Sequence, residues 1–317
     1  VAVVTLIAAA VATLVMALYA KRPFGQAPGL GLNAFFAFTV VGALGVPWQT
    51  ALAAVVVEGL LFILLTAVGA REYVINVFPT PVKLAVGTGI GLFLAIIGLE
   101  AMGIVVDDPA TLVTLGSVAS DPVAIVSVVG LFLTFGLYAR GVKGSIVVGI
   151  LFTTLLGAAV KAAGFAPEAP LLGNLSASAT YDITPLAGSF VTGLQNVEGL
   201  AFALIVFTFF FVDFFDTAGT LVGVSQVAGF LDEKGDLPDI DKPLMADAVG
   251  TTVGGILGTS TVTTYIESAA GVEEGGRTGM TALVVGLLFL ASLAIVPLAA
   301  AVPLYASHIA LVVIGVV

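Results

Sequence analysis

The sequence contains no cysteine and a single histidine, His308. The absence of cysteine excludes disulfide bridges, thiolate metal sites and cysteine nucleophiles. A lone histidine cannot form a histidine cluster for a metal ion, and it argues against a Ser-His-Asp triad. No P-loop, GxGxxG or zinc-finger spacing occurs either, so chemistry driven by ATP has no support in the sequence.

Charge is also scarce. The 317 residues include only 10 Lys and Arg and 20 Asp and Glu, which is 9% of the chain and gives a net charge of −10. Soluble domains carry about 25% charged residues. The excess of acid and the absence of clustered Lys and Arg exclude nucleic acid as an expected partner, because phosphate binding needs basic groups.

Long runs without charged residues make up much of the chain. They cover residues 1–20, 23–57, 122–139, 144–160 and 278–317, and the mean hydropathy of the chain is +1.19. A membrane-spanning helix needs about 20 mostly apolar residues. The sequence therefore predicts an all-α polytopic membrane protein.

Charges, prolines and glycines divide the chain into eleven predicted membrane segments. We place them at 1–20, 31–46, 49–70, 82–100, 122–139, 144–160, 197–222, 243–258, 260–275, 278–297 and 303–317. If the segments alternate in direction, nine of the ten Lys and Arg lie on one side and only Lys161 lies on the other. The positive-inside rule makes the side with nine cytoplasmic. Val1 then lies outside, so we expect at least one further span before it.

Two acids lie three residues apart in the aromatic segment FTFFFVDFFDTAGTLVG, at Asp213 and Asp216. This spacing puts them on about the same helix face, where two buried carboxyl groups can share a proton. Acids at membrane depth are costly and usually face a cavity or a partner. We favour Asp216 as the functional acid because small polar residues follow it. The alternative is a structural cap or pair.

A third acid, Glu267, lies in LGTSTVTTYIESAAG. The β-branched run TVTTYI predicts extended backbone, which survives at membrane depth only where it is buried in protein or lines a cavity. Residues 27–40 (APGLGLNAFFAFTV) are the counterpart, because glycine and proline again interrupt an apolar span before Asn33. Two interrupted spans indicate a transporter binding site. In the alternative, these glycines only allow helices to pack closely. Glu58 and Asp247 are weaker candidates.

Four segments together resemble the guanine/hypoxanthine permease (AzgA-like) branch of the nucleobase–cation symporters, within the xanthine/uracil permease family. They are APGLGLNAFFAFTVV, VKLAVGTGIGLFLAIIGL, VDFFDTAGTLVGV and ADAVGTTVGGILGTSTVTTYIESAAGVEEGGRTG. The resemblance runs along nearly the whole chain, and GTSTVTTYIESAAG is its most specific motif.

The resemblance implies fourteen spans in two inverted seven-span repeats, divided into core and gate domains, with the third and tenth spans broken by short strands. The eleven segments would be the second to the twelfth span. Residues 1–160 would be the first repeat without its first span, 161–196 an extracytoplasmic connection, and 197–317 the second repeat without its last two spans. The broken spans would be 27–46 and 259–275.

The resemblance also implies roles for individual residues. Glu267 would accept hydrogen bonds from purine ring nitrogens, and Tyr265 and Ile266 would place backbone groups beside the base. Asp216 matches the acidic site residue of the eighth span, with Asp213 as the fallback. Asn33, Phe36 and Thr264 complete the implied binding set, with Phe36 stacking on the base. Proton coupling would involve Asp216, Glu267 and Asp213.

We therefore expect a secondary active transporter, not an enzyme, that imports guanine, hypoxanthine or adenine by proton symport and alternating access in the cell membrane. No cofactor or metal is expected, sodium remains an alternative coupling ion, and a homodimer is compatible with the resemblance. One rival is an anion transporter of the same fold, for sulfate or bicarbonate, but no Lys or Arg at membrane depth offsets the acids. The other is a non-transporting membrane scaffold, which would need neither broken spans nor buried acids.

Overall fold

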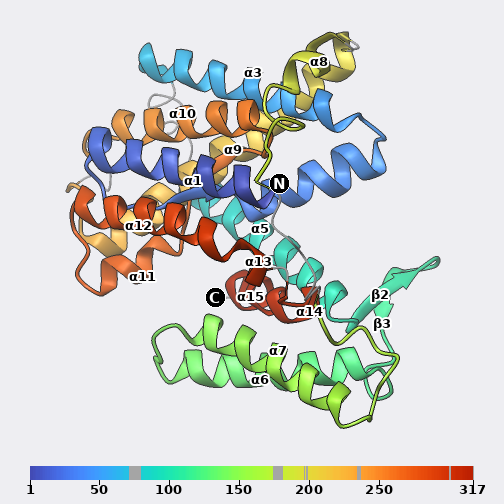
Figure 1. The fold of residues 1–317 in the computed structure, drawn as a ribbon. Coiled ribbons are helices and arrows are strands. Elements are labelled where there is room, and N and C mark those ends of the chain that lie inside the picture. Colours follow the sequence, from blue (N-terminus) through green and yellow to red (C-terminus); the bar gives the residue numbers. More distant parts are fainter. Residues whose placement is uncertain are drawn as a thin grey trace. The chain divides into compact units, whose positions relative to one another are not determined.

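The computed structural model describes residues 1–70, 80–173, 181–195, 197, 199–233, 237–299 and 301–316. These residues are mostly helical, with two short two-stranded sheets (Figure 1). The chain divides into two compact units. Unit 1 consists of Val1–Gly87 and Thr180–Ala294, and unit 2 consists of Thr88–Ala179 and Ile295–Val317. Each unit therefore draws on both halves of the sequence.

Unit 1 contains the two broken segments and the helices around them. Its first half holds α1 (Ala2–Val15), which continues as the π-helical turn η1 (Met16–Ala20), β1 (Gln26–Pro28), α2 (Leu30–Ala34), which continues as η2 (Phe35–Ala43), and α3 (Trp48–Ala67). Its second half holds α8 (Phe190–Gln195), α9 (Gly199–Ala228), α10 (Asp241–Leu257), β4 (Val262–Thr264), α11 (Ser268–Glu273) and α12 (Gly279–Ser292).

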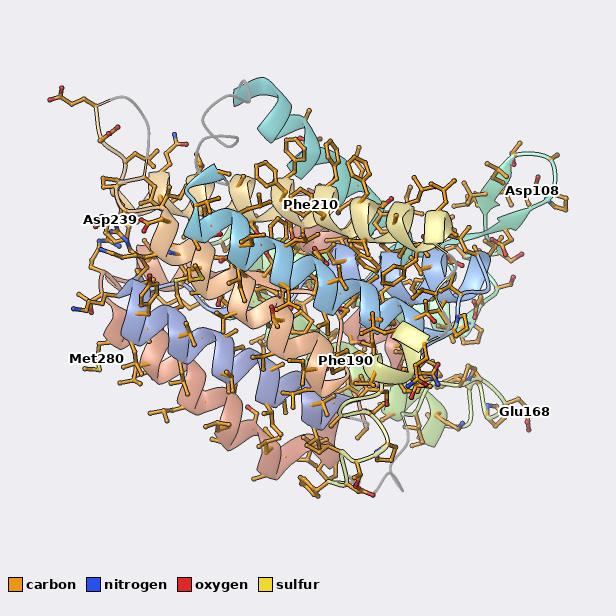
Figure 2. All side chains as sticks on the ribbon, turned by 90° about the horizontal axis from the view of Figure 1, so that it is seen from above. Asp108, Glu168, Phe190, Phe210, Asp239 and Met280 are labelled. Atoms are coloured by element: carbon orange, nitrogen blue, oxygen red, sulfur yellow. The ribbon has the colours of Figure 1, made fainter. Side chains whose placement is uncertain are left out.

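Small residues let the helices of unit 1 approach one another closely. Helices α10 and α12 both lie beside α1 (Figure 1), whose buried face is mostly alanine. A Cβ atom at Gly59 of α3 would lie 2.7 Å from the backbone nitrogen of Thr252 on α10, so only glycine fits there. Small residues at helix interfaces are typical of membrane proteins, because close backbone approach replaces the hydrophobic driving force. Aromatic contact joins α3 and α9, where Phe62 stacks on Phe210 at 4.5 Å between ring centroids. Figure 2 labels Phe210 on α9.

Unit 2 is built from helices and one hairpin. It contains the greater part of α5 (Thr80–Ala101), β2 (Val105–Asp108), β3 (Leu112–Leu115), α6 (Pro122–Ala139), α7 (Ser145–Ala162), α13 (Val296–Ala299), α14 (Leu304–Ser307) and α15 (Ile309–Val316). Strands β2 and β3 pair antiparallel, with Val105 opposite Leu115. Asp121 caps α6 by accepting from the backbone N–H of Val123 at 2.9 Å, and Pro122 occupies the first helical position. This is a common way to start a helix.

The observed helices coincide with the predicted segments to within a few residues at most ends. Among the described residues, six helices are long and apolar enough to span a membrane, and three shorter ones are also apolar. The first six are Ala2–Ala20, Trp48–Ala67, Pro122–Ala139, Ser145–Ala162, Gly199–Ala228 and Gly279–Ala299. The chain is thus a multi-pass membrane protein, whereas the total of eleven spans and the repeat boundaries at 160 and 197 stay predictions. The β2–β3 hairpin was not predicted. It forms in the acidic connection after α5.

Candidate functional site

Two three-residue strands join the interrupted segments of unit 1. Strand β1 pairs antiparallel with β4, with Ala27 opposite Thr263, and all six strand residues are buried. The ladder continues at both ends: the Gly29 N–H donates to the Thr261 carbonyl at 3.1 Å, and the Tyr265 N–H donates to the Gly25 carbonyl at 3.0 Å. The expectation of extended backbone in TVTTYI is confirmed. Each strand satisfies the backbone groups that the other would otherwise leave bare in the membrane.

Short helices follow both strands. Helix α2 begins at Leu30, directly after Gly29, and α11 begins at Ser268. The first N–H groups of a helix have no partner inside it, so the start of α2 can present donors. The first two N–H groups of α11 already donate to carbonyl oxygens of the turn before it. The Ser268 hydroxyl accepts from the Gly25 N–H at 2.9 Å and so ties the start of α11 to the chain before β1. The two helix starts are thereby held at opposite ends of one small sheet.

Asp216 lies at the start of α2. A Cβ atom at Gly29 would be 3.4 Å from the Asp216 Oδ2 and 2.9 Å from the Thr263 side chain, so a larger residue at 29 would crowd both. The Asp216 side chain is half-buried, and its carboxyl group is close enough to those of Asp247 and Glu267 to interact with them electrostatically. Asp216 therefore lies beside the start of α2 and within electrostatic range of two further acids.

Asp213 has different surroundings, although it lies only one turn earlier on α9. It is fully buried, as are Thr217 and Asp247. The Thr217 hydroxyl lies 3.3 Å from Asp213 Oδ1, 3.1 Å from Asp247 Oδ2 and 2.9 Å from the Thr263 hydroxyl. One hydroxyl hydrogen cannot serve two carboxylates at once. The structure thus places Asp213 in an interior hydrogen-bond network and Asp216 at the edge of the broken segments.

Asn33 and Tyr265 come together on the carbonyl oxygen of Pro28. The Tyr265 hydroxyl donates to this oxygen at 2.6 Å, and the Asn33 Nδ2 lies 3.5 Å from it. The Ser260 hydroxyl donates to the Asn33 Oδ1. The amide oxygen of Asn33 is therefore already engaged, and its half-buried NH₂ group remains the better placed part for an external acceptor.

The remaining predicted residues have varied surroundings. Glu267 and Ile266 are exposed in the turn between β4 and α11. Thr264 is buried beside the amide of Gln26. Phe36 is half-buried and packs on Phe209 of α9 at 6.2 Å between ring centroids. The structure thus places most of the predicted set in or beside the strand pair and Phe36 against α9, while the roles of these residues in binding stay predictions.

Gln26 is the residue that the sequence reasoning missed. It is fully buried in β1, and its amide fits best when the nitrogen donates to the Ala12 carbonyl at 3.0 Å and the oxygen accepts from the Asp247 N–H and the Thr264 hydroxyl. Its backbone N–H also donates to the Thr13 hydroxyl at 2.9 Å. A glutamine inside the uncharged run 23–57, just before Ala-Pro-Gly, was the available signal.

An apolar groove of about 480 Å³ lies between α3 and α9. Its lining consists only of apolar side chains: Val57, Leu61, Leu64, Leu65, Phe202, Ala203, Val206, Phe207 and Phe210. Such a groove cannot orient a polar molecule, so we place the candidate site at the strand pair. In the described part of the chain, no group of three or more His, Cys, Asp or Glu has the geometry to hold a metal ion. The strand pair therefore offers carboxyl acceptors, one amide and the N–H donors at the start of α2.

Comparison with known proteins finds that this chain is similar to permeases. The sequence profile described as "Permease family" (Xan_ur_permease) matches residues 1–317. A putative permease of Methanocaldococcus jannaschii is 47% identical over 99% of this chain and 70% of its own length. The adenine permease AdeP of Escherichia coli is 40% identical over 99% of this chain and 68% of its own. The guanine/hypoxanthine permease PbuG of Bacillus subtilis is 39% identical over 98% and 69%.

Solved structures share the fold. The transmembrane domain of the cyanobacterial bicarbonate transporter BicA superposes with a TM-score of 0.70, covering 99% of this chain and 85% of that one, at 16% sequence identity. At this identity the likeness concerns the fold alone.

Proposed function

The chain belongs to the Xan_ur_permease family of permeases, and on that basis we propose that it imports purine nucleobases, guanine, hypoxanthine or adenine, by proton symport. The names of relatives at 38–41% identity, which are adenine and guanine/hypoxanthine permeases, support the choice of substrate.

The observation on which the proposal rests is the position of Asp216. This acid of α9 lies against Gly29, where β1 gives way to α2, and it interacts electrostatically with Glu267 of the other broken segment. A purine base presents N–H donors and carbonyl or ring-nitrogen acceptors in one plane. Carboxylates accept from the N–H groups, and helix-start N–H groups donate to the acceptors.

In this proposal Glu267 and Asp216 bind the N–H edge of the base. Asn33 donates from its amide, and the backbone of Tyr265 and Ile266 lies beside the base, with Thr264 behind it. Phe36 stacks on the purine ring in the bound state.

Coupling requires a group that gains and loses a proton as the site changes access. Carboxyl groups at membrane depth commonly do this. We assign the role to Asp216 and Glu267, with Asp213, one turn earlier on α9, as the fallback acid. Sodium is the alternative coupling ion. Alternating access would use the two compact units as its moving bodies.

The rival of the same fold is an anion transporter, as in BicA. The segments that form the site argue against it, because α2, α3, α9 and β4 contain no Lys or Arg while α3 and α9 contain three acids. An anion would meet only like charge there.

Uptake of radiolabelled hypoxanthine, guanine and adenine in cells that lack their own purine permeases tests the proposal. We expect saturable uptake by the wild type that collapses with a protonophore. Glu267→Gln and Asp216→Asn should each lower uptake at least about 100-fold, since hydrogen bonds to charged groups contribute about 1.5–3 kcal/mol each and coupling is lost as well.

Glu100→Gln is the matched control, because Glu100 is an exposed carboxylate on α5 of unit 2. It should transport like the wild type. If the wild type reaches the membrane and moves no purine, the substrate class is wrong. If it moves purines and both site variants keep the full rate, the transporter assignment stands and the site is wrong.

A further inference from the structure

Glu58 is a buried acid that the proposed function leaves unused. It lies in the middle of α3, within the apolar run VVVEGLLF, and its side chain is 0% exposed. An acid at such a position is costly and is expected to meet a specific partner. The Thr261 hydroxyl is such a partner, and it donates to the Glu58 Oε2 at 3.2 Å.

Thr261 connects Glu58 to the broken segments. It lies directly before β4, and its carbonyl oxygen accepts from the Gly29 N–H at 3.1 Å. Gly29 in turn is the residue before α2, against which Asp216 lies. The side chain of Thr261 is therefore hydrogen-bonded to α3, and its backbone is hydrogen-bonded to the residue before α2.

Helix α3 provides a rigid support for this contact. At Gly59, next to Glu58, the backbones of α3 and α10 touch, because a Cβ atom there would lie 2.7 Å from Thr252 N and 2.9 Å from Thr252 Cα. The adjacent Thr251 of α10 donates to the Val262 carbonyl of β4 at 2.7 Å. The α3–α10 pair thus holds consecutive residues of the β4 segment, at 261 through Glu58 and at 262 through Thr251.

We propose that Glu58 is a positioning residue for the substrate site: it fixes Thr261, and through Thr261 it sets the geometry of Gly29 and the start of α2. The uptake part of the test rests on the proposed purine transport. Glu58 acts as a hydrogen-bond acceptor in this role, so a neutral acceptor of the same shape should replace it.

The alternative role is that of a proton carrier. Two further acids, Asp213 and Asp247, lie buried on the neighbouring helices α9 and α10. Substitution by glutamine separates the two roles, since glutamine accepts from Thr261 and cannot carry a proton.

Uptake kinetics test the positioning role. Glu58→Gln should keep the KM for hypoxanthine within about twofold and leave the pH profile unchanged, because the acceptor remains. Glu58→Met and Thr261→Val should each raise the KM about 10-fold or more, as expected for a lost hydrogen bond to a buried charged group. The effects of the two substitutions should be less than additive in the double variant, since both remove the contact between Glu58 and Thr261. Thr208→Val is the control, because Thr208 is a half-buried threonine of α9 whose hydroxyl donates within its own helix, to the Leu204 carbonyl.

Hydrogen–deuterium exchange of the purified protein gives a reading that does not depend on substrate. Amides of residues 25–33 and 259–267 should exchange faster in Glu58→Met and Thr261→Val and at wild-type rates in Glu58→Gln and Thr208→Val. This result would stand even if the wild type moved no purine, so failure of the transport proposal and failure of this one are distinguishable. Unchanged exchange in Thr261→Val, or a Glu58→Gln variant that loses coupling with normal exchange, would overturn the positioning role.

Discussion

In unit 2, the buried hydroxyls of Ser127, Thr134 and Thr153 each donate at 2.7 Å to a carbonyl oxygen four residues earlier in the same helix. In unit 1, the buried hydroxyls of Thr217 and Thr261 instead contact other elements: Thr217 meets α10 and β4, and Thr261 meets α3. These hydroxyls of unit 2 thus bond within their own helix, whereas those at the broken segments of unit 1 bond to other elements. Away from the broken segments, unit 1 follows the pattern of unit 2, since the Thr252 hydroxyl of α10 donates to the Ala248 carbonyl of its own helix at 2.9 Å.

The difference follows from the backbone. The helices of unit 2 satisfy their own peptide groups, so a threonine there needs nothing more than the carbonyl beside it. The broken segments of unit 1 need partners from elsewhere, and buried acids, amides and hydroxyls supply them. Among the described residues that are buried, the carboxylates Glu58, Asp213 and Asp247 all belong to unit 1. Buried carboxylates and irregular backbone therefore occur together, in the unit that contains the candidate site.

An identical substitution in each unit should give the largest contrast. Thr217→Val removes the hydroxyl that two buried acids share, and we expect the free energy of unfolding to fall by about 2–3 kcal/mol, because hydrogen bonds to charged groups contribute about 1.5–3 kcal/mol. Thr153→Val removes only a bond within a helix and should cost less than about 1 kcal/mol. Thermal unfolding of the two purified variants measures the difference.

Both threonines are 0% exposed and both changes keep the side-chain volume, so packing is matched. Thr217→Ser serves as the control that restores the hydroxyl and should recover most of the lost stability. Equal losses for Thr217→Val and Thr153→Val would remove the contrast between the units.

The second prediction concerns unit 2 alone. Helices α6 and α7 pack by glycine against threonine: a Cβ atom at Gly130 would lie 2.9 Å from the Thr153 Cβ, and one at Gly149 would lie 2.9 Å from the Thr134 Cβ. Gly130→Ala should therefore lower the free energy of unfolding by about 1–2 kcal/mol through overpacking. Because the candidate site lies in unit 1, the KM for purine should stay within about twofold of the wild-type value.

Gly136→Ala on the same helix is the control, since nothing lies within 4 Å of a Cβ atom there, and alanine should be neutral or slightly stabilising. A raised KM in Gly130→Ala with a normal KM in Gly136→Ala would mean that unit 2 contributes to binding, contrary to the proposed division of roles.

The helices were predictable because uncharged runs and charged connections mark them in the sequence, and β4 was predictable from its β-branched residues. Strand β1 was expected only from the family resemblance, which implies a short strand in residues 27–46. Three residues ending in proline give no strand signal of their own, and the partner strand is far away in the sequence. The β2–β3 hairpin was missed for a related reason, since its residues occur in an acidic connection that reads as a loop.

Within the candidate site, the sequence identified the acids but could not separate their surroundings. Asp213 and Asp216 lie on nearly the same face of α9, and only the tertiary contacts with Thr217 and Gly29 distinguish them. Glu58 was recognised as an acid at membrane depth, but its partner Thr261 comes from a segment that helix periodicity cannot place beside α3.

We expect the smallest difference between the two units at exposed turns outside the membrane segments. Asp108, near the tip of the β2–β3 hairpin (Figure 2), accepts from the Thr111 and Ala110 N–H groups at 2.8 Å, and Asp182 of unit 1 accepts from the Thr184 hydroxyl and N–H.

These bonds hold the pKa of both carboxyl groups below the ordinary value of 3.8, for Asp108 chiefly through the Thr111 N–H and for Asp182 chiefly through the Thr184 hydroxyl. A lowered pKa means that the bonds stabilise each turn above the ordinary pKa and are lost as the pH falls through the lowered one. Hydrogen exchange at Ala110, Thr111 and Thr184, corrected for intrinsic rates, should therefore show protection that disappears in strong acid at both turns. Asp108→Asn and Asp182→Asn should each abolish the pH dependence at their own turn and leave purine uptake unchanged. A response at one turn only would extend the difference between the units beyond their membrane-embedded parts, whereas matching responses confine that difference to the buried polar contacts.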